Sequence, residues 1–158
     1  MNKSSSDVAW DFPEPHVIEI DVAGDDIDGY GHVNNAVYVS WLDKCAFDHC
    51  DAVGINAELC RSLNRGMAAI RHEIDYLIAG YQGNQILVGD WVTYNDGKLR
   101  AQRRFQMIRV EDQKTLLRCV SNYVCTDLTS GRPARMPSQF IADFCVLPSV
   151  AEALLLEN

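Results

Sequence analysis

A carboxylate, two glycines, a histidine and two amides stand close together in the segment Asp28-Gly-Tyr-Gly-His-Val-Asn-Asn35. A carboxylate can attack a carbonyl carbon, or it can activate water as a general base. Glycines let a ligand approach the backbone closely. If a helix begins directly after this segment, its free N–H groups and its dipole can stabilise an oxyanion. The same pattern is also typical of an ordinary capped loop–helix junction, so spacing alone does not decide.

A helix is predicted directly after this segment, from about Ala36 to Val53. Asn34 or Asn35 is a suitable N-cap, and Gly54 stands where a left-handed C-terminal cap belongs. Apolar residues recur at helical spacing and form one stripe: Tyr38, Trp41, Leu42, Cys45, His49, Ala52 and Val53. The start of this helix would position the polar segment.

The other predicted elements are mainly strands. A short strand at Val17–Val22 precedes the polar segment, and the period becomes alternating from Ile70 to Ile78. Further strands are predicted at residues 85–94, 98–110 and 115–126. Asn95-Asp96-Gly97 is a hairpin turn, and residues 111–113 form a weaker one. One apolar helix against one curled antiparallel sheet gives an α+β fold.

The chain is expected to form a single domain over residues 16–158, preceded by a flexible tail at residues 1–15. Trp10 and Phe12 are the tail residues suited to contact the domain. A short C-terminal helix is predicted with a capping box between Ser149 and Glu152.

Composition limits the possible functions. The formal net charge of −8 argues against nucleic-acid binding, which normally needs a basic surface. No run approaches the roughly 18 apolar residues of a membrane span, and residues 1–16 lack a signal-peptide core. We therefore expect a cytoplasmic protein without membrane contact. The six cysteines form no C-x-x-C pair, and neither a metal site nor a cofactor is expected.

The segment Asp28 to Tyr38, DGYGHVNNAVY, resembles the signature of the 4-hydroxybenzoyl-CoA thioesterase family, and is similar to the form in its long-chain acyl-CoA thioesterase branch. That family adopts the hot-dog fold, in which a curled antiparallel sheet wraps a long central helix. The element order and the exit at Gly131-Arg132-Pro133 extend the resemblance over residues 16–140, although only the first segment is specific. The resemblance implies a thioesterase acting on a fatty or aromatic acyl-CoA.

The resemblance also implies roles for individual residues. Asp28 matches the catalytic aspartate, which attacks the thioester carbonyl or activates water. Gly66 matches a glycine whose N–H polarises that carbonyl, and the helix start from Asn35 to Val37 supplies a second polarising group. His32 either touches the ligand or only orders the loop. One branch of the family has histidine where Asn35 stands, so proton transfer here falls to Asp28 or water.

Other interpretations remain open at this point. Asp43 is a rival acid, although it lies off the apolar stripe, and His49 and His72 are expected to be satisfied core histidines. A hot-dog hydratase or dehydratase would need a histidine paired with an acid, and a non-catalytic acyl-CoA-binding module would not need Asp28. The resemblance further implies a homodimer or homotetramer with active sites at the dimer interface. Several arginines are candidates for the coenzyme A phosphates.

Overall fold

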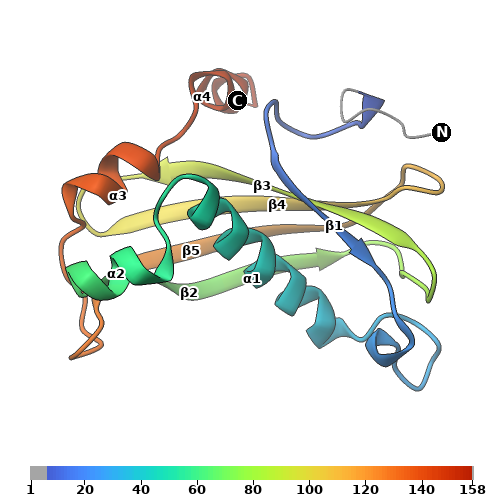
Figure 1. The fold of residues 1–158 in the computed structure, drawn as a ribbon. Coiled ribbons are helices and arrows are strands. Elements are labelled where there is room, and N and C mark those ends of the chain that lie inside the picture. The colour runs from blue at the N-terminus through green and yellow to red at the C-terminus, as the bar shows by residue number, and fades with distance from the viewer. Residues whose placement is uncertain (1–6, 158) are drawn as a thin grey trace.

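The structure is a computed structural model that describes residues 7–157; residues 1–6 and 158 lie outside the described part. Its centre is one curled antiparallel sheet with the strand order β1-β3-β4-β5-β2 (Figure 1). The strands are β1 (His16–Asp21), β2 (Arg65–Tyr76), β3 (Gln85–Asn95), β4 (Arg100–Arg109) and β5 (Thr115–Asp127). These bounds confirm the predicted strands, except that β2 begins at Arg65, before the alternating pattern that starts at Ile70. The order leaves β1 and β2 at the two edges.

The long helix α1 (Asn35–Ala52) packs across one face of this sheet. Its buried side chains are Tyr38, Trp41, Leu42, Cys45 and Ala46. They join residues of β1, β3, β4 and β5 in the main core, as the apolar stripe predicted. The Asn34 side chain accepts a hydrogen bond from the Ala36 N–H and caps the helix. Gly54 has a φ of 87°, the left-handed conformation expected after the last turn.

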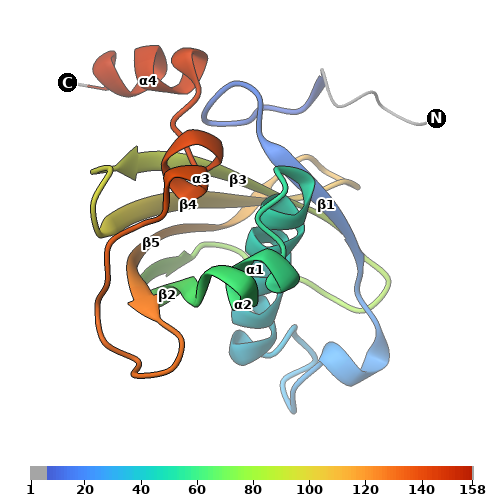
Figure 2. The ribbon, with the colours of Figure 1, turned by 60° about the vertical axis from the view of Figure 1, so that its left-hand side comes forward.

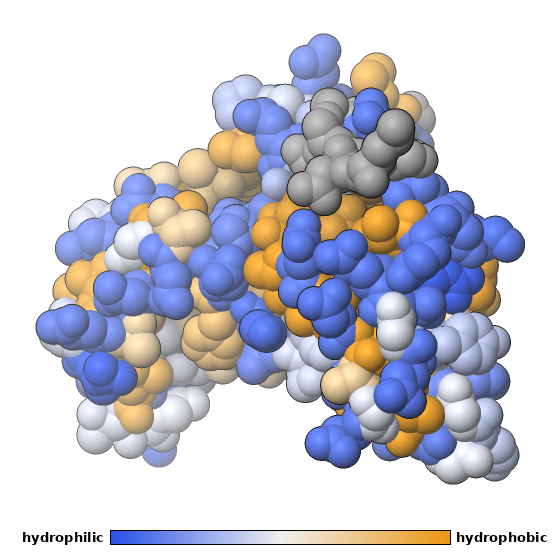
Figure 3. All heavy atoms as spheres, turned by 45° about the vertical axis from the view of Figure 1, so that its right-hand side comes forward, coloured by the Kyte–Doolittle hydropathy of each residue, from blue (hydrophilic) through white to orange (hydrophobic). Residues whose placement is uncertain are grey.

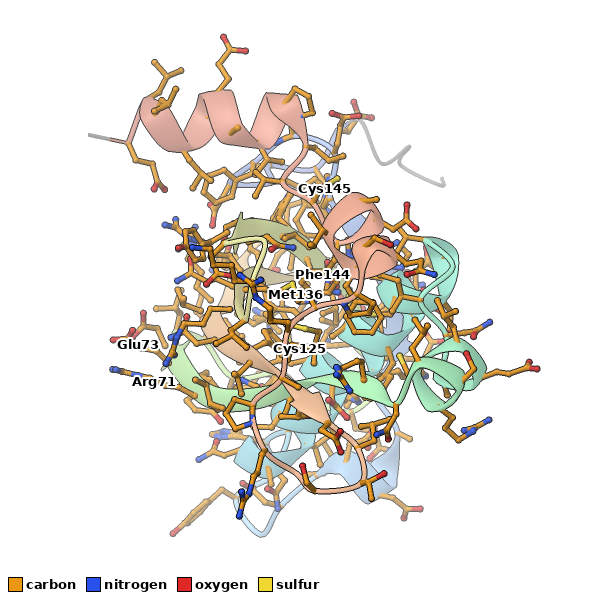
Figure 4. All side chains as sticks on the ribbon, turned by 90° about the vertical axis from the view of Figure 1, so that its left-hand side faces the viewer. Arg71, Glu73, Cys125, Met136, Phe144 and Cys145 are labelled. Atoms are coloured by element: carbon orange, nitrogen blue, oxygen red, sulfur yellow. The ribbon has the colours of Figure 1, made fainter. Side chains whose placement is uncertain are left out.

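Two short helices at the far end of α1 were not predicted. They are α2 (Ala57–Leu63) and α3 (Ser138–Asp143), and Figure 2 shows them on the same side of the sheet. Segments of seven and six residues are too short to show a helical period. They cover a second core cluster that includes Cys125, Met136 and Phe144, which lie in the interior in Figure 4. Within the described residues, no helix is long and apolar enough to cross a membrane.

Part of the predicted tail packs on the sheet. Phe12 is buried, and the rings of Trp10 and Phe12 both meet the ring of Trp91 edge to face. The Trp91 indole also donates a hydrogen bond to the Pro13 carbonyl. Residues 10–13 are therefore fixed against β3, while residues 1–6 of the predicted tail lie outside the described residues.

The C-terminal helix α4 (Pro148–Leu155) is present, but its predicted capping box is wrong. Leu147 is the N-cap, with no side-chain cap, and Pro148 occupies the first turn. The Ser149 hydroxyl instead donates to the carboxylate of Glu14. Proline has no N–H, so one of the donors that a cap would satisfy is missing, and the helix begins without the predicted cap. A short 3-10 helix, η2 (Gly24–Asp26), completes the regular elements that are described.

The cysteine thiols give a first test of this packing. All six are free, and burial raises the pKa of the thiols of Cys50, Cys119 and Cys125, whereas Cys145 is exposed. A thiol with a raised pKa stays protonated and unreactive near pH 8. We expect the native protein to show one fast reaction with DTNB, which Cys145→Ser removes. A fast phase that survives this substitution would contradict the packing.

Candidate active site

The Asp28 carboxylate is held by the backbone of its own loop. Its Oδ1 accepts hydrogen bonds from the N–H groups of Tyr30 at 2.9 Å and His32 at 3.4 Å. The Asp28 N–H in turn donates to the His32 carbonyl at 2.8 Å. Gly31, between them, has a φ of 81°, which a side chain would disfavour. The loop therefore fixes a half-exposed carboxylate directly before α1.

The first turn of α1 leaves one donor free. The Ala36 N–H donates to the Asn34 side chain at 2.9 Å, and the Val37 N–H donates to the Asn34 carbonyl at 2.9 Å. The Asn35 N–H has no acceptor among the described residues. It lies at the positive end of the helix dipole, where an oxyanion is stabilised.

Asp28 and Asn35 line the same pocket, which we call the Asp28 pocket. Its volume is about 330 Å³. It is lined by Asp28, Tyr30, His32, Val33, Asn35, Tyr38, Tyr76, Leu77, Ile78 and Ala79. Two tyrosines fix its wall: the Tyr76 hydroxyl donates to the Asn35 carbonyl at 3.0 Å, and the Tyr38 hydroxyl accepts from the Gly80 N–H at 2.9 Å. Burial raises the pKa of both phenols, so both stay neutral and are unsuited to act as bases.

The other predicted site residues lie differently. His32 lines the pocket, and its ring meets the ring of Tyr81 edge to face at 5.3 Å. Val37 does not line it: this half-buried side chain packs against the main core. The Val37 N–H donates to the Asn34 carbonyl at 2.9 Å, and the role of Val37 in substrate binding stays a prediction.

Gly66 lines a separate pocket, the Gly66 pocket, of about 290 Å³. The lining comprises Phe47, Cys50, Ile55, Ala57, Cys60, Arg61, Gly66, Met67, Ala68, Thr126, Leu128 and Phe140. Asp28 is not among these residues. Within one chain, therefore, the two predicted catalytic residues are not brought together.

The backbone of Gly66 is engaged in the sheet. Gly66 stands opposite Thr126, and the neighbouring Leu128 N–H donates to the Asn64 carbonyl at 3.3 Å. Hydrogen-bonded pairs alternate along an antiparallel ladder, so the Gly66 N–H also faces β5. Its expected role as a carbonyl donor therefore competes with this pairing and stays a prediction. A Cβ at Gly66 would lie 2.9 Å from Leu128 Cδ2, so the glycine keeps space open beside that side chain.

A buried ionic cluster of Asp90, Arg103 and His49 lies next to the Gly66 pocket. Arg103 Nη1 is 2.9 Å from Asp90 Oδ1, and His49 Nδ1 is 2.5 Å from the same oxygen. Arg103 Nη2 donates to the sulfur of Cys50 at 3.3 Å. Burial is the largest single effect and favours the neutral guanidine, but Asp90 together with Cys50, Tyr123 and Cys45 outweighs it, so the pKa of Arg103 is raised. His49 thus has a charged partner, as a satisfied core histidine requires.

The remaining candidates do not reach the Asp28 pocket. His72 Nδ1 is 2.7 Å from the Ser121 hydroxyl, but His72 is exposed on β2, so the expectation of a core histidine is wrong for this residue. Asp43 is exposed on α1. Neither side chain lines the pocket. The contact between Tyr76 and the start of α1 could not be predicted from the local sequence, because Tyr76 lies far along the chain, at the end of β2.

A curled antiparallel sheet that packs one long helix, with a carboxylate loop at the start of that helix, defines the class: a hot-dog α+β domain. The chain belongs to the Thioesterase-like superfamily, whose model matches residues 22–154.

Solved structures of low sequence identity share this fold. A 1,4-dihydroxy-2-naphthoyl-CoA thioesterase from Synechocystis is 18% identical, with a TM-score of 0.74 over 84% of this chain and 96% of that one. A Staphylococcus aureus protein solved in complex with CoA is 15% identical, with a TM-score of 0.77 over 83% and 82%. A DHNA-CoA thioesterase from Staphylococcus aureus is 15% identical, with a TM-score of 0.71 over 90% of both chains.

Proposed function

We propose that this protein is an acyl-CoA thioesterase, related to the 4-hydroxybenzoyl-CoA thioesterase family, with Asp28 as its catalytic carboxylate. The observation that carries the proposal is the Asp28 pocket, which is lined by a fixed carboxylate and by Asn35, whose N–H has no acceptor among the described residues. Membership of the Thioesterase-like superfamily supports it, and the CoA complex of the Staphylococcus aureus protein supports a CoA ester as substrate. The free thiols agree with a reducing cytoplasm.

The arrangement fits hydrolysis of a thioester. The carbonyl oxygen would accept a hydrogen bond from the Asn35 N–H, where the helix dipole stabilises the oxyanion. Asp28 would attack the carbonyl carbon, or take a proton from a water molecule that attacks it. The carbon–sulfur bond then breaks and coenzyme A leaves as a thiolate. If Asp28 is the nucleophile, the acyl group remains on it as an anhydride, which water hydrolyses to release the acid. Because a thiol has a pKa near 8.5, the thiolate leaves without a general acid.

We further propose that two copies complete the site by pairing their β2 strands. Strand β2 is an edge strand of 12 residues. Ile70, near its centre, is 53% exposed, and an uncovered edge strand offers unpaired N–H and C=O groups to another strand. The strand lies along the lower border of the sheet in Figure 1, and the surface is hollowed along that border between two lobes (Figure 3).

Pairing of this kind would join the two pockets. Tyr76, Leu77 and Ile78 at the end of β2 line the Asp28 pocket. Gly66, Met67 and Ala68 at its start line the Gly66 pocket. In an antiparallel pair of β2 strands, the end of one strand lies beside the start of the other. The Asp28 pocket of one copy would then open onto the Gly66 pocket of its partner.

Ile70→Lys tests the pairing. A lysine near the two-fold axis would face its own copy, and like charges directly opposite destabilise paired strands. We expect a shift from dimer or tetramer to monomer at micromolar concentration, with at least a tenfold loss of kcat/KM. Light scattering after size exclusion measures the mass. Tyr94→Lys is the control, because Tyr94 is 52% exposed but lies on β3. An unchanged mass for Ile70→Lys would contradict pairing through β2.

Thiol release from a panel of acyl-CoA esters tests the activity itself. Release of coenzyme A with the free acid as product supports the thioesterase. Consumption of an enoyl-CoA without thiol release would point instead to a hydratase. Binding of acyl-CoA without any turnover would point to a non-catalytic binding module.

A further inference from the structure

The Gly66 pocket has an apolar interior. Neither Thr126 nor Arg61 offers a free polar group to its interior. The Thr126 hydroxyl donates to the Gly66 carbonyl at 3.1 Å, and Arg61 is an exposed residue of α2. The thiols of Cys50 and Cys60 stay neutral, because burial raises the pKa of both. A cavity without polar partners holds water poorly and accepts hydrocarbon.

The pocket has a closed end and a mouth. Phe140 is fully buried on α3, whereas Phe47 and Leu128 are largely exposed. Helix α3 is held in place, because the Asn95 side chain donates to the Phe144 carbonyl at 2.6 Å. Figure 4 shows Phe144 and Met136 in the interior beside this helix. The closed end is therefore a fixed wall rather than a movable cover.

The size of the pocket sets the size of an occupant. A cavity of roughly 150 Å³ lined by aliphatic and aromatic side chains holds benzene. The Gly66 pocket, at about 290 Å³, has room for roughly twice that volume. Since benzene has six carbons, this corresponds to an apolar group of about ten to twelve carbon atoms.

The two pockets differ in polarity. The Asp28 pocket presents a carboxylate, an amide and a histidine together with apolar side chains such as Leu77 and Ile78, whereas the lining of the Gly66 pocket is almost entirely apolar. Coenzyme A carries phosphates and amides, whose burial without partners is costly. The acyl group is the part of the substrate that gains from the apolar pocket.

We propose that the Gly66 pocket holds the acyl group of a substrate bound at the partner's Asp28, and that Phe140 limits this group to medium length, about ten to twelve carbons. The inference rests on the proposed function. Below that limit each additional methylene raises kcat/KM by up to about fourfold, and beyond it the gain stops.

The test fills the pocket without opening a cavity. Ala57 lines the pocket from the first turn of α2, so Ala57→Phe places a ring inside it. We expect the ratio of kcat/KM for decanoyl-CoA to that for butanoyl-CoA to fall at least tenfold. Ala151→Phe, on the exposed face of α4, is the matched control and keeps the wild-type ratio. Phe140→Ala is expected to raise the ratio for hexadecanoyl-CoA against decanoyl-CoA.

A binding experiment separates this inference from the hydrolysis itself. S-decyl-CoA, a thioether that cannot be hydrolysed, is expected to bind the wild-type protein about 100-fold more tightly than coenzyme A. Ala57→Phe should remove most of that gain. If the wild-type protein releases no thiol but shows this binding pattern, the proposed function fails and the acyl pocket stands. If Ala57→Phe leaves both the ratio and the binding gain unchanged, the acyl group lies elsewhere and the inference is overturned.

Discussion

Replacing Asp28 with asparagine is expected to lower kcat/KM for acyl-CoA hydrolysis by roughly 100- to 10,000-fold, the range for loss of a positioned base. Asparagine keeps an oxygen at Oδ1, so it can still accept the hydrogen bond from the Tyr30 N–H that orders the loop. It cannot take a proton from water and is a poor nucleophile. The loss should therefore fall on kcat, with KM little changed.

The measurement is thiol release with DTNB under saturating and sub-saturating acyl-CoA. A Cys145→Ser background removes the exposed thiol of the protein from the assay. Asp43→Asn is the matched control, because Asp43 lies exposed on α1 outside the pocket. Retained activity in Asp28→Asn, with its circular dichroism unchanged, would assign the chemistry to another group. Equal losses in both variants would indicate damage to α1 rather than a catalytic role.

The framework around Asp28 follows from local sequence signals. The spacing of Tyr38, Trp41, Leu42 and Cys45 predicts the buried face of α1, and Gly54 predicts its end. Both signals are local, because helical period and a left-handed cap depend on neighbouring residues. The polar loop before α1 follows for the same reason.

The remaining features depend on contacts between distant residues. Tyr76 reaches the carbonyl of Asn35 across 41 positions, and no local pattern marks that bond. Val37 and Tyr38 are neighbours on α1 and both contact the core, but only Tyr38 lines the pocket, which depends on how α1 packs against the sheet. The separation of Gly66 from Asp28 reflects the chain fold, since Gly66 lies at the start of β2 whereas the Asp28 pocket is lined by residues at the end of β2. The resemblance pairs them, and the proposed pairing of two β2 strands would bring them together across two copies.

The ionic cluster of Asp90, Arg103 and His49 is the clearest case of this limit. The sequence places Asp90 and Arg103 in two strands, where charged residues are normally solvated. Here their side chains are 0% and 1% exposed. His49 reaches Asp90 across 41 positions and approaches Arg103 across 54. The cluster joins α1 to β3 and β4 behind the Gly66 pocket, so it fixes the wall against which an acyl group would pack.

Arg103→Met is expected to lower the free energy of unfolding by about 3–5 kcal/mol, the cost of removing one partner from a buried ion pair. Asp90 would keep only His49 and the weak Cys45 thiol as donors in a dry environment. The aromatic contact would also weaken, because the Arg103 guanidinium lies 4.4 Å from the centre of the Phe144 ring. Urea unfolding at a fixed protein concentration measures the change, since association would otherwise alter the midpoint.

The next residue of β4 supplies the control. Arg104 pairs with Glu157 at 2.9 Å on the surface, and its side chain is 31% exposed. Arg104→Met should therefore cost less than about 1 kcal/mol. Adding Asp90→Asn to Arg103→Met should recover part of the lost stability, because the double variant buries no uncompensated carboxylate. If Arg103→Met costs no more than Arg104→Met, the buried cluster does not hold α1 to the sheet.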